Sequence, residues 1–284
     1  MKDQMSDALL VTGLHKNYGD HAVLKGVDFS VRRGEIFALL GSNGAGKTTT
    51  LECIEGLRRY DSGTITVNGR TGIQLQSASL PEHIRAMEAV RLFAGWNRTS
   101  ADETMLSSLG IGELSGKQYY QLSTGQKRRL HLALALIRDP DILFLDEPTT
   151  GVDAVSRSEF WDMLSDLKRR GISMLVSTPY MDEARRCDRI ALCDRGRLLG
   201  VDTPQGIVRG FGGRLYTLSG GEMYGLLVAA RREPASRSAI LSARRTTSLR
   251  DRISIPKGSC ADSPARVSAA LSSARPNPEL RMFS

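Results

Sequence analysis

The sequence predicts an α/β fold in which helices flank a mixed, mainly parallel central sheet. Short apolar runs typical of buried parallel strands alternate with amphipathic helical patterns over residues 35–187. At both ends of this region, pairs of strand-like runs are joined by turn signals and predict antiparallel strands. We expect some of these strands to form a separate antiparallel β subdomain. Residues of about 77–138 have mostly helical patterns, so we expect a helical insertion subdomain there.

The first elements are strands. Residues 8–12, 22–24 and 27–31 have strand-like composition, and residues 16–20 between them predict a turn-rich loop. Tyr18 in this loop has a π-face that can stack on a flat base, although a lone tyrosine in a loop is more often a packing residue. Further strands are predicted at 64–67 and 73–76, and Asn68-Gly69 signals a tight turn between them.

A glycine-rich loop separates an apolar strand at 35–40 from a helix predicted at 50–57. It is Gly41-Ser42-Asn43-Gly44-Ala45-Gly46-Lys47-Thr48-Thr49, which matches G-x-x-x-x-G-K-[ST] in its strand–helix context. The glycines let backbone N–H groups approach phosphate oxygens, and the helix N-terminus adds a favourable field. The motif predicts that Lys47 reaches the β- and γ-phosphates and that Thr48 binds Mg²⁺. A turn that binds nothing is the weaker alternative.

Two adjacent carboxylates follow the apolar strand at 142–145. Before them, a helix from 122 to about 138 has its apolar stripe at i, i+3, i+4 and i+7. Open α/β sheets bind ligands at the carboxyl ends of their strands, so Asp146 is suited to hold Mg²⁺ and Glu147 to activate a water as general base. The alternative is a surface Asp-Glu-Pro turn.

The remaining elements complete the sheet. Ser156 and Glu159 predict a capping box for a helix that ends before Gly171. A buried strand at 172–176, a short helix at 181–187 and an antiparallel pair over 189–201 with a turn at 194–196 follow.

Composition argues against a membrane-spanning, exported or nucleic-acid-binding protein. No apolar run approaches the about 20 residues that cross a bilayer, and the first residues lack a signal-peptide core, so we expect an unexported protein. The four cysteines lack metal-ligand spacing. Of the net charge of +8, residues 231–284 contribute +7, from ten arginines and one lysine against four acids. The remaining residues, 1–230, are therefore nearly neutral, so we do not expect this body of the chain to bind nucleic acid.

We therefore expect an ATP-binding domain over residues 1–222 and a basic tail over residues 223–284. Disorder is the favoured interpretation of this Arg-, Ser- and Ala-rich tail. A basic arm that grips acidic lipid or nucleic acid, and the loss of an ancestral reading frame, are the alternatives.

In this order, the motifs resemble the ATP-binding subunits of ABC transporters over residues 8–215, and residues 178–184 resemble the switch region of ABC-2-type exporters. The resemblance implies ATP and Mg²⁺ as ligands. It assigns adenine stacking to Tyr18, nucleotide contacts to the loop Gly41–Thr49, and metal contacts to Thr48, Gln76 and Asp146. Lys47, Gln76 and Glu147 are the implied catalytic residues.

Residues 122–126 (LSTGQ) are similar to the family signature LSGGQ, with Thr124 in place of a glycine, and Asp153 lies in a D-loop-like segment. The resemblance implies a head-to-tail dimer in which Ser123, Gly125, Gln126 and Asp153 face the partner's nucleotide. It also implies a separate membrane permease as partner, and a place on the inner face of the cell membrane.

Pro179 departs from the family pattern, which has a histidine here that contacts the γ-phosphate. Proline has no side-chain donor and no N–H. Either Glu147 supports hydrolysis alone, with reduced activity, or the chain is the hydrolysis-deficient half of a heterodimer. A soluble ABC ATPase acting on nucleic acid or ribosomes is a further alternative, although the chain has one cassette and no sustained heptads.

Overall fold

The computed structural model describes residues 7–74, 79–210, 214–218, 224, 228, 236–242 and 245–250. The chain divides into two compact units, residues 1–204 and 205–284. The division of the chain into an ATP-binding domain over 1–222 and a basic tail over 223–284 stays a prediction.

A six-stranded sheet forms the centre of the first unit. Its strands in order are β5 (Thr71–Gln74), β6 (Ile142–Asp146), β7 (Ser173–Thr178), β3 (Ile36–Leu40), β8 (Arg189–Asp194) and β9 (Arg197–Asp202). The first five run parallel, and β9 pairs antiparallel with β8. Every residue of β3, β6 and β7 is buried, which explains why their central residues are apolar.

A second, antiparallel sheet has the order β2-β1-β4, with β1 at Asp7–Tyr18, β2 at His21–Arg32 and β4 at Ser62–Val67. Tyr18 pairs with His21, so the turn between β1 and β2 is only two residues long. The loop predicted over 16–20 is therefore too long, because strand pairing extends β1 to Tyr18.

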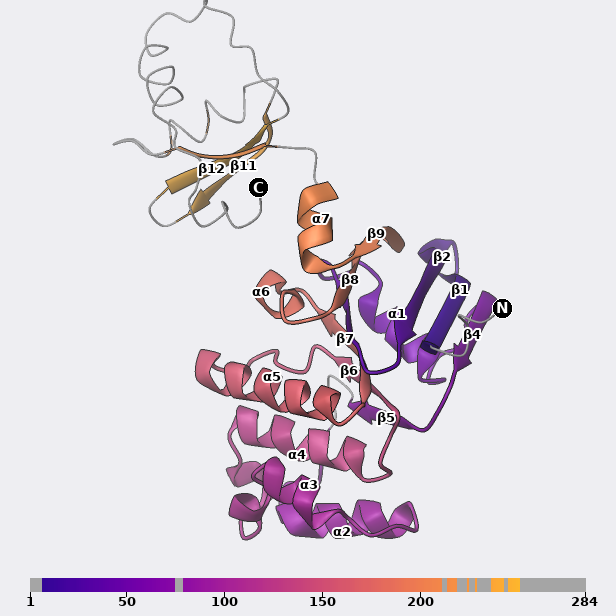
Figure 1. The fold of residues 1–284 in the computed structure, drawn as a ribbon, viewed down its shortest axis with the longest axis vertical. Helices are drawn as coiled ribbons and strands as arrows, with labels where there is room; N and C mark the ends of the chain where they lie inside the picture. The colour runs from indigo at the N-terminus through magenta and orange to yellow at the C-terminus, as the bar shows by residue number, and fades with distance from the viewer. Residues whose placement is uncertain are drawn as a thin grey trace, which may run out of the picture. The chain divides into compact units, whose positions relative to one another are not determined.

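Helices cover both faces of the six-stranded sheet (Figure 1). The apolar core on one face is shared with α4 (Thr124–Leu136), α5 (Ala154–Arg169) and α6 (Met181–Ala184), and it extends to α2 (Ala86–Trp96), which contacts α4, and to α3 (Glu103–Ser108). The other face packs against α1 (Lys47–Ile54) and the antiparallel sheet. Because side chains alternate along a strand, Ile36 and Ala38 enter the first core and Phe37 the second. The predicted fold class is confirmed.

Some predicted helix boundaries are wrong. The helix α1 begins at Lys47 rather than at residue 50, because Gly46 (φ +100°) is its N-cap and the loop passes directly into the first turn. The helix α6 ends at Ala184 rather than at 187. As predicted, Gly171 follows the end of α5 with a left-handed backbone, at φ +93°.

The helix α7 (Pro204–Gly210) lies at the division between the units. The second unit contains an antiparallel sheet of β10 (Arg214–Leu218), β12 (Arg245–Arg250) and β11 (Ser236–Ser242). Strands β11 and β12 lie within the segment predicted to be disordered; much of the rest of that segment lies outside the described residues. Within the described part of the chain, no helix is long and apolar enough to span a membrane.

Candidate nucleotide-binding site

The glycine-rich loop owes its shape to backbone geometry and to a close neighbour. Gly44 and Gly46 have φ of +81° and +100°, a region that L-residues rarely adopt. At Gly41, a Cβ atom would lie 2.4 Å from the carbonyl oxygen of Cys193 on β8. Glycine is therefore required at 41 by the packing of β8 behind the loop, a reason that the motif itself does not show.

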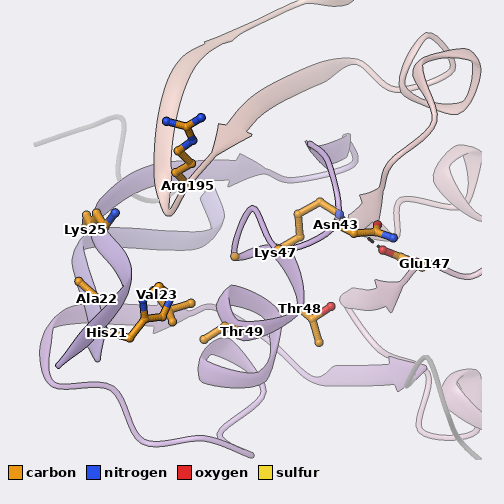
Figure 2. Close-up of a pocket in the computed structure, with 12 residues that line it drawn as sticks. His21, Ala22, Val23, Lys25, Asn43, Lys47, Thr48, Thr49, Glu147 and Arg195 are labelled. Carbon is orange, nitrogen blue, oxygen red and sulfur yellow. Dashed lines mark ion pairs between the residues drawn. The ribbon is translucent and has the colours of Figure 1, made fainter. Parts of the chain in front are cut away.

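Lys47 is buried (4% exposed) and is held by its own loop. Its Nζ donates hydrogen bonds to the carbonyl oxygens of Gly41 (3.0 Å) and Ser42 (3.2 Å). It also forms an ion pair with Glu147, at 3.5 Å between Nζ and Oε1 (Figure 2). The ammonium group thus stands between the phosphate loop and the proposed general base.

Asp146 ends β6 and is 5% exposed. Its Oδ1 accepts hydrogen bonds from the hydroxyl groups of Thr48, at 3.3 Å, and Ser177. Burial raises the pKa of this carboxyl group, and the two hydroxyl donors oppose the rise. The structure brings the predicted metal residues Thr48 and Asp146 together.

Glu147 has a φ of +43°, which is uncommon outside glycine. Its N–H lies within hydrogen-bond distance of both the Ser177 carbonyl oxygen (3.2 Å) and the Ser177 Oγ (3.0 Å). Its Oε2 accepts a hydrogen bond from the Thr150 hydroxyl at 3.1 Å. Strained backbone held by several partners is typical of functional sites, and here it turns the carboxylate toward Lys47.

A pocket of about 610 Å³ opens over the phosphate loop and Glu147 (Figure 2). It is lined by His21, Ala22, Val23, Lys25, Asn43, Gly44, Gly46, Lys47, Thr48, Thr49, Glu147 and Arg195. The contributions of β2 and of the β8–β9 turn were missed in the sequence, since no local motif marks them. Of the chain's four histidines, all of them described, only His21 lines this pocket.

Tyr18 lies beside the pocket rather than in its wall. It pairs with the pocket residue His21 across the β1–β2 turn and is 42% exposed. The Nζ of Lys16 and the Cζ of Arg58 lie 5.3 and 5.2 Å from the centre of its ring. These cation–π contacts hold the ring at the edge of the site.

The signature-like segment does not line the pocket. Ser123 is the N-cap of α4: its Oγ accepts from the Gln126 N–H (3.2 Å), and the Gln126 side chain accepts from the Ser123 N–H (3.1 Å). A Cβ atom on Gly125 would lie 2.9 Å from the Cβ of Ser156 on α5. This segment therefore also serves as a capping box and a helix contact.

Asp153 is likewise outside the pocket lining and is the N-cap of α5. Its Oδ1 accepts from the N–H groups of Val155 (3.1 Å) and Ser156 (3.0 Å), and the bond from Ser156 is the main cause of its lowered pKa. The predicted capping box of Ser156 and Glu159 is wrong, because the helix begins earlier. Gln76 lies outside the described residues.

A buried glutamate that the sequence analysis missed lies beside Pro179. Glu183 is 2% exposed and accepts hydrogen bonds from the hydroxyl groups of Thr149 and of Thr178, the latter at 2.6 Å. Arg157 forms an ion pair with it at 3.6 Å. Glu183 thus connects the loop after Glu147 to the end of β7.

The hydroxyl and carboxylate groups at the end of β6 and the start of α1 fit a magnesium ion that also binds to phosphate oxygens of a ligand. Among the described residues, no group of three or more His, Cys, Asp or Glu side chains is placed to hold a metal. Mg²⁺ at phosphate sites is commonly held by one or two carboxylates together with phosphate oxygens. The hydroxyl of Thr48 and the carboxylate of Asp146 match that donor set.

A phosphate loop on a parallel sheet, with a lysine, a threonine and two carboxylates at the strand ends, defines a P-loop nucleoside triphosphatase. Residues 24–150 match the ABC transporter family. The chain is 38% identical over 214 residues to Nod factor export ATP-binding protein I of Burkholderia orbicola (strain AU 1054), covering 69% of this chain and 70% of that protein. It belongs to the ATP-binding subunits of ABC transporters, as predicted.

Other similar proteins are also ATP-binding proteins. Daunorubicin resistance ATP-binding protein DrrA3 of Streptomyces coeruleorubidus is 38% identical over 216 residues, which cover 69% of this chain and 68% of that protein. A solved structure of an ATP-binding subunit of an ABC transporter superposes with a TM-score of 0.64 at 28% identity, covering 72% of this chain and 93% of that one.

Proposed function

We propose that this chain binds and hydrolyses ATP to power a membrane exporter. The observation that supports this most is the convergence of Lys47, Thr48 and Glu147 at one end of a single pocket, with Asp146 hydrogen-bonded to Thr48. The two curated relatives described above are named for Nod factor export and daunorubicin resistance, which favours export as the direction of transport.

Each residue has a proposed role. The loop Gly41–Thr49 and Lys47 bind the phosphates, and Glu147 accepts a proton from the attacking water. Thr48, Asp146 and Gln76 hold Mg²⁺, which neutralises charge on the β- and γ-phosphates when bound. Tyr18 stacks on adenine at the edge of the pocket.

The working form is proposed to be a head-to-tail dimer with nucleotide at the interface. Ser123, Gly125, Gln126 and Asp153 do not line the pocket of their own chain. They stand at the N-termini of α4 and α5, where the helix dipole favours an anion. These residues are therefore available to the nucleotide of a second ATPase domain.

A separate permease is proposed as the membrane partner, and the chain is placed on the inner face of the cell membrane as a peripheral subunit. Contact with the permease is assigned to the segment from Gln76 through the helical region. No nucleic-acid partner is proposed, because the body of the chain is nearly neutral.

Because Pro179 stands where the family has a histidine, we consider two proposals for ATP hydrolysis. In the first, activity persists at a reduced level, because Lys47, Mg²⁺ and the partner's signature stabilise the developing charge. In the second, this chain is the hydrolysis-deficient half of a heterodimer.

Steady-state ATP turnover by the full chain, measured over increasing protein concentration with Glu147→Gln as the blank, tests the proposal. Turnover that rises faster than linearly and is lost in the variant supports a self-pairing ATPase. ATP binding without turnover supports the heterodimer. Absence of ATP binding contradicts the proposed function.

A further inference from the structure

The turn between β8 and β9 is fixed against the nucleotide pocket by two backbone hydrogen bonds. The N–H of Gly196 donates to the Ala45 carbonyl oxygen of the phosphate loop at 3.0 Å. The N–H of Lys25 on β2 donates to the Gly196 carbonyl oxygen at 2.9 Å. The turn therefore cannot move without disturbing both the phosphate loop and β2.

Gly196 allows this close approach. Its φ is +81°, and a Cβ atom there would lie 2.0 Å from the Val23 carbonyl oxygen, closer than side chains can come. The neighbouring Arg195 also has a positive φ, of +46°. The tight turn thus places Arg195 at one defined position on the rim.

The Arg195 side chain is available to a ligand. It is 89% exposed, and its ion-pair partner among the described residues is the adjacent Asp194, at 4.0 Å. An exposed pair of this length contributes little stability, so the arginine is not needed for the fold. It nevertheless lines the pocket (Figure 2).

The position of Arg195 distinguishes two ends of the pocket. Lys47, Thr48 and Glu147 form the phosphate end, whereas Arg195 lies on the other side, near Lys25 and above β2 (Figure 2). Because the pocket-lining residues outside the phosphate loop and Glu147 come from β2 and the β8–β9 turn, the space for the base of a nucleotide whose phosphates occupy the loop lies toward this second end. A guanidinium group is planar, stays charged and stacks well on flat π-systems.

We propose that Arg195 is a nucleotide-binding residue whose guanidinium group stacks on the nucleobase. This inference rests on the proposed function, because it assumes a nucleoside triphosphate in the pocket. It adds an electrostatically attractive contact to the base that is separate from Tyr18 and that no sequence motif marks.

Calorimetric titration of the full chain with Mg²⁺-ATP and with Mg²⁺-tripolyphosphate tests the assignment. Because stacking of a cation on an exposed π-face is weak, Arg195→Ala is expected to weaken ATP binding by about fivefold. Tripolyphosphate has no base, so its affinity is expected to stay the same. Arg195→Lys keeps the charge but not the planar group, and is expected to weaken ATP binding as well.

Arg197→Ala is the matched control, because Arg197 is an exposed arginine of the same hairpin that does not line the pocket. It should leave both affinities unchanged. Equal weakening of ATP and tripolyphosphate by Arg195→Ala, full rescue by lysine, or no effect would overturn the stacking assignment. If the unaltered chain binds no ATP, the proposed function itself fails, and that result is distinct from all of these.

Discussion

The two ends of the nucleotide pocket are built differently. At the phosphate end, Lys47 and Glu147 are buried, form an ion pair with each other and are hydrogen-bonded to their neighbours. At the other end, His21 of β2 and Arg195 of the β8–β9 turn are exposed and come from segments that are distant in the sequence. The charged side chains of the phosphate end are thus held in place before a ligand binds, whereas those of the other end are exposed side chains that a ligand can contact. We expect changes at the first to affect chemistry and changes at the second to affect affinity.

The largest expected effect is on hydrolysis. Glu147→Gln removes the proton acceptor but keeps the shape of the side chain, and should lower ATP turnover by about 10²-fold or more. ATP affinity should fall little. Turnover and calorimetry on the same preparation check this. Retained turnover would mean that the phosphate end does not hold the general base.

The second prediction concerns the turn that supports Arg195. Gly196→Ala would place a methyl group against the Val23 carbonyl oxygen, so we expect a loss of about 3 kcal/mol in unfolding free energy and weaker ATP binding. Gly34→Ala is the control, because Gly34 also has a positive φ (+70°) but open space, to 4 Å, around the position that a Cβ would take. Equal losses in denaturant titrations would show that the close approach is unimportant.

The third prediction concerns the buried charge of Asp146, which is hydrogen-bonded to Thr48 of the phosphate end. Because burial raises the pKa of Asp146 above its unfolded value, the folded protein keeps this proton to higher pH, and stability falls as pH rises through that interval. Asp146→Asn should therefore stabilise the nucleotide-free chain at pH 8 by about 1 kcal/mol and weaken Mg²⁺-dependent binding. Thermal melts at pH 5 and 8 check this, with the exposed Asp20→Asn as control.

The smallest expected effect lies outside the pocket. Asp153→Ala removes the N-cap of α5 and should cost about 1 kcal/mol of stability. Asp102→Ala removes the equivalent cap of α3 and should cost a similar amount. If Asp153 also meets a partner's nucleotide, only its variant should lower turnover while leaving ATP affinity unchanged. Equal turnover of the two variants would limit Asp153 to capping.

The sequence predicted the phosphate end because its parts are local. Gly41–Thr49 is contiguous, and Asp146 and Glu147 directly follow a buried strand, so pattern and spacing were enough. The boundaries of α1 and the cap of α5 were predicted wrongly. Both depend on which of several adjacent polar or small residues meets the first free N–H groups, and composition alone does not decide that.

Sequence patterns were enough to predict the fold class, the phosphate loop and the two carboxylates, because each is set by short-range periodicity or by a continuous motif. Long-range packing instead explains why Arg195 lines the pocket, why Glu183 connects the loop after Glu147 to the end of β7, and why Gly41 must accommodate β8. The contact between Thr149 and Glu183 spans 34 residues of the chain, and the close approach of Cys193 to Gly41 spans many more. They exist because parallel strands are neighbours in the sheet without being neighbours in the chain.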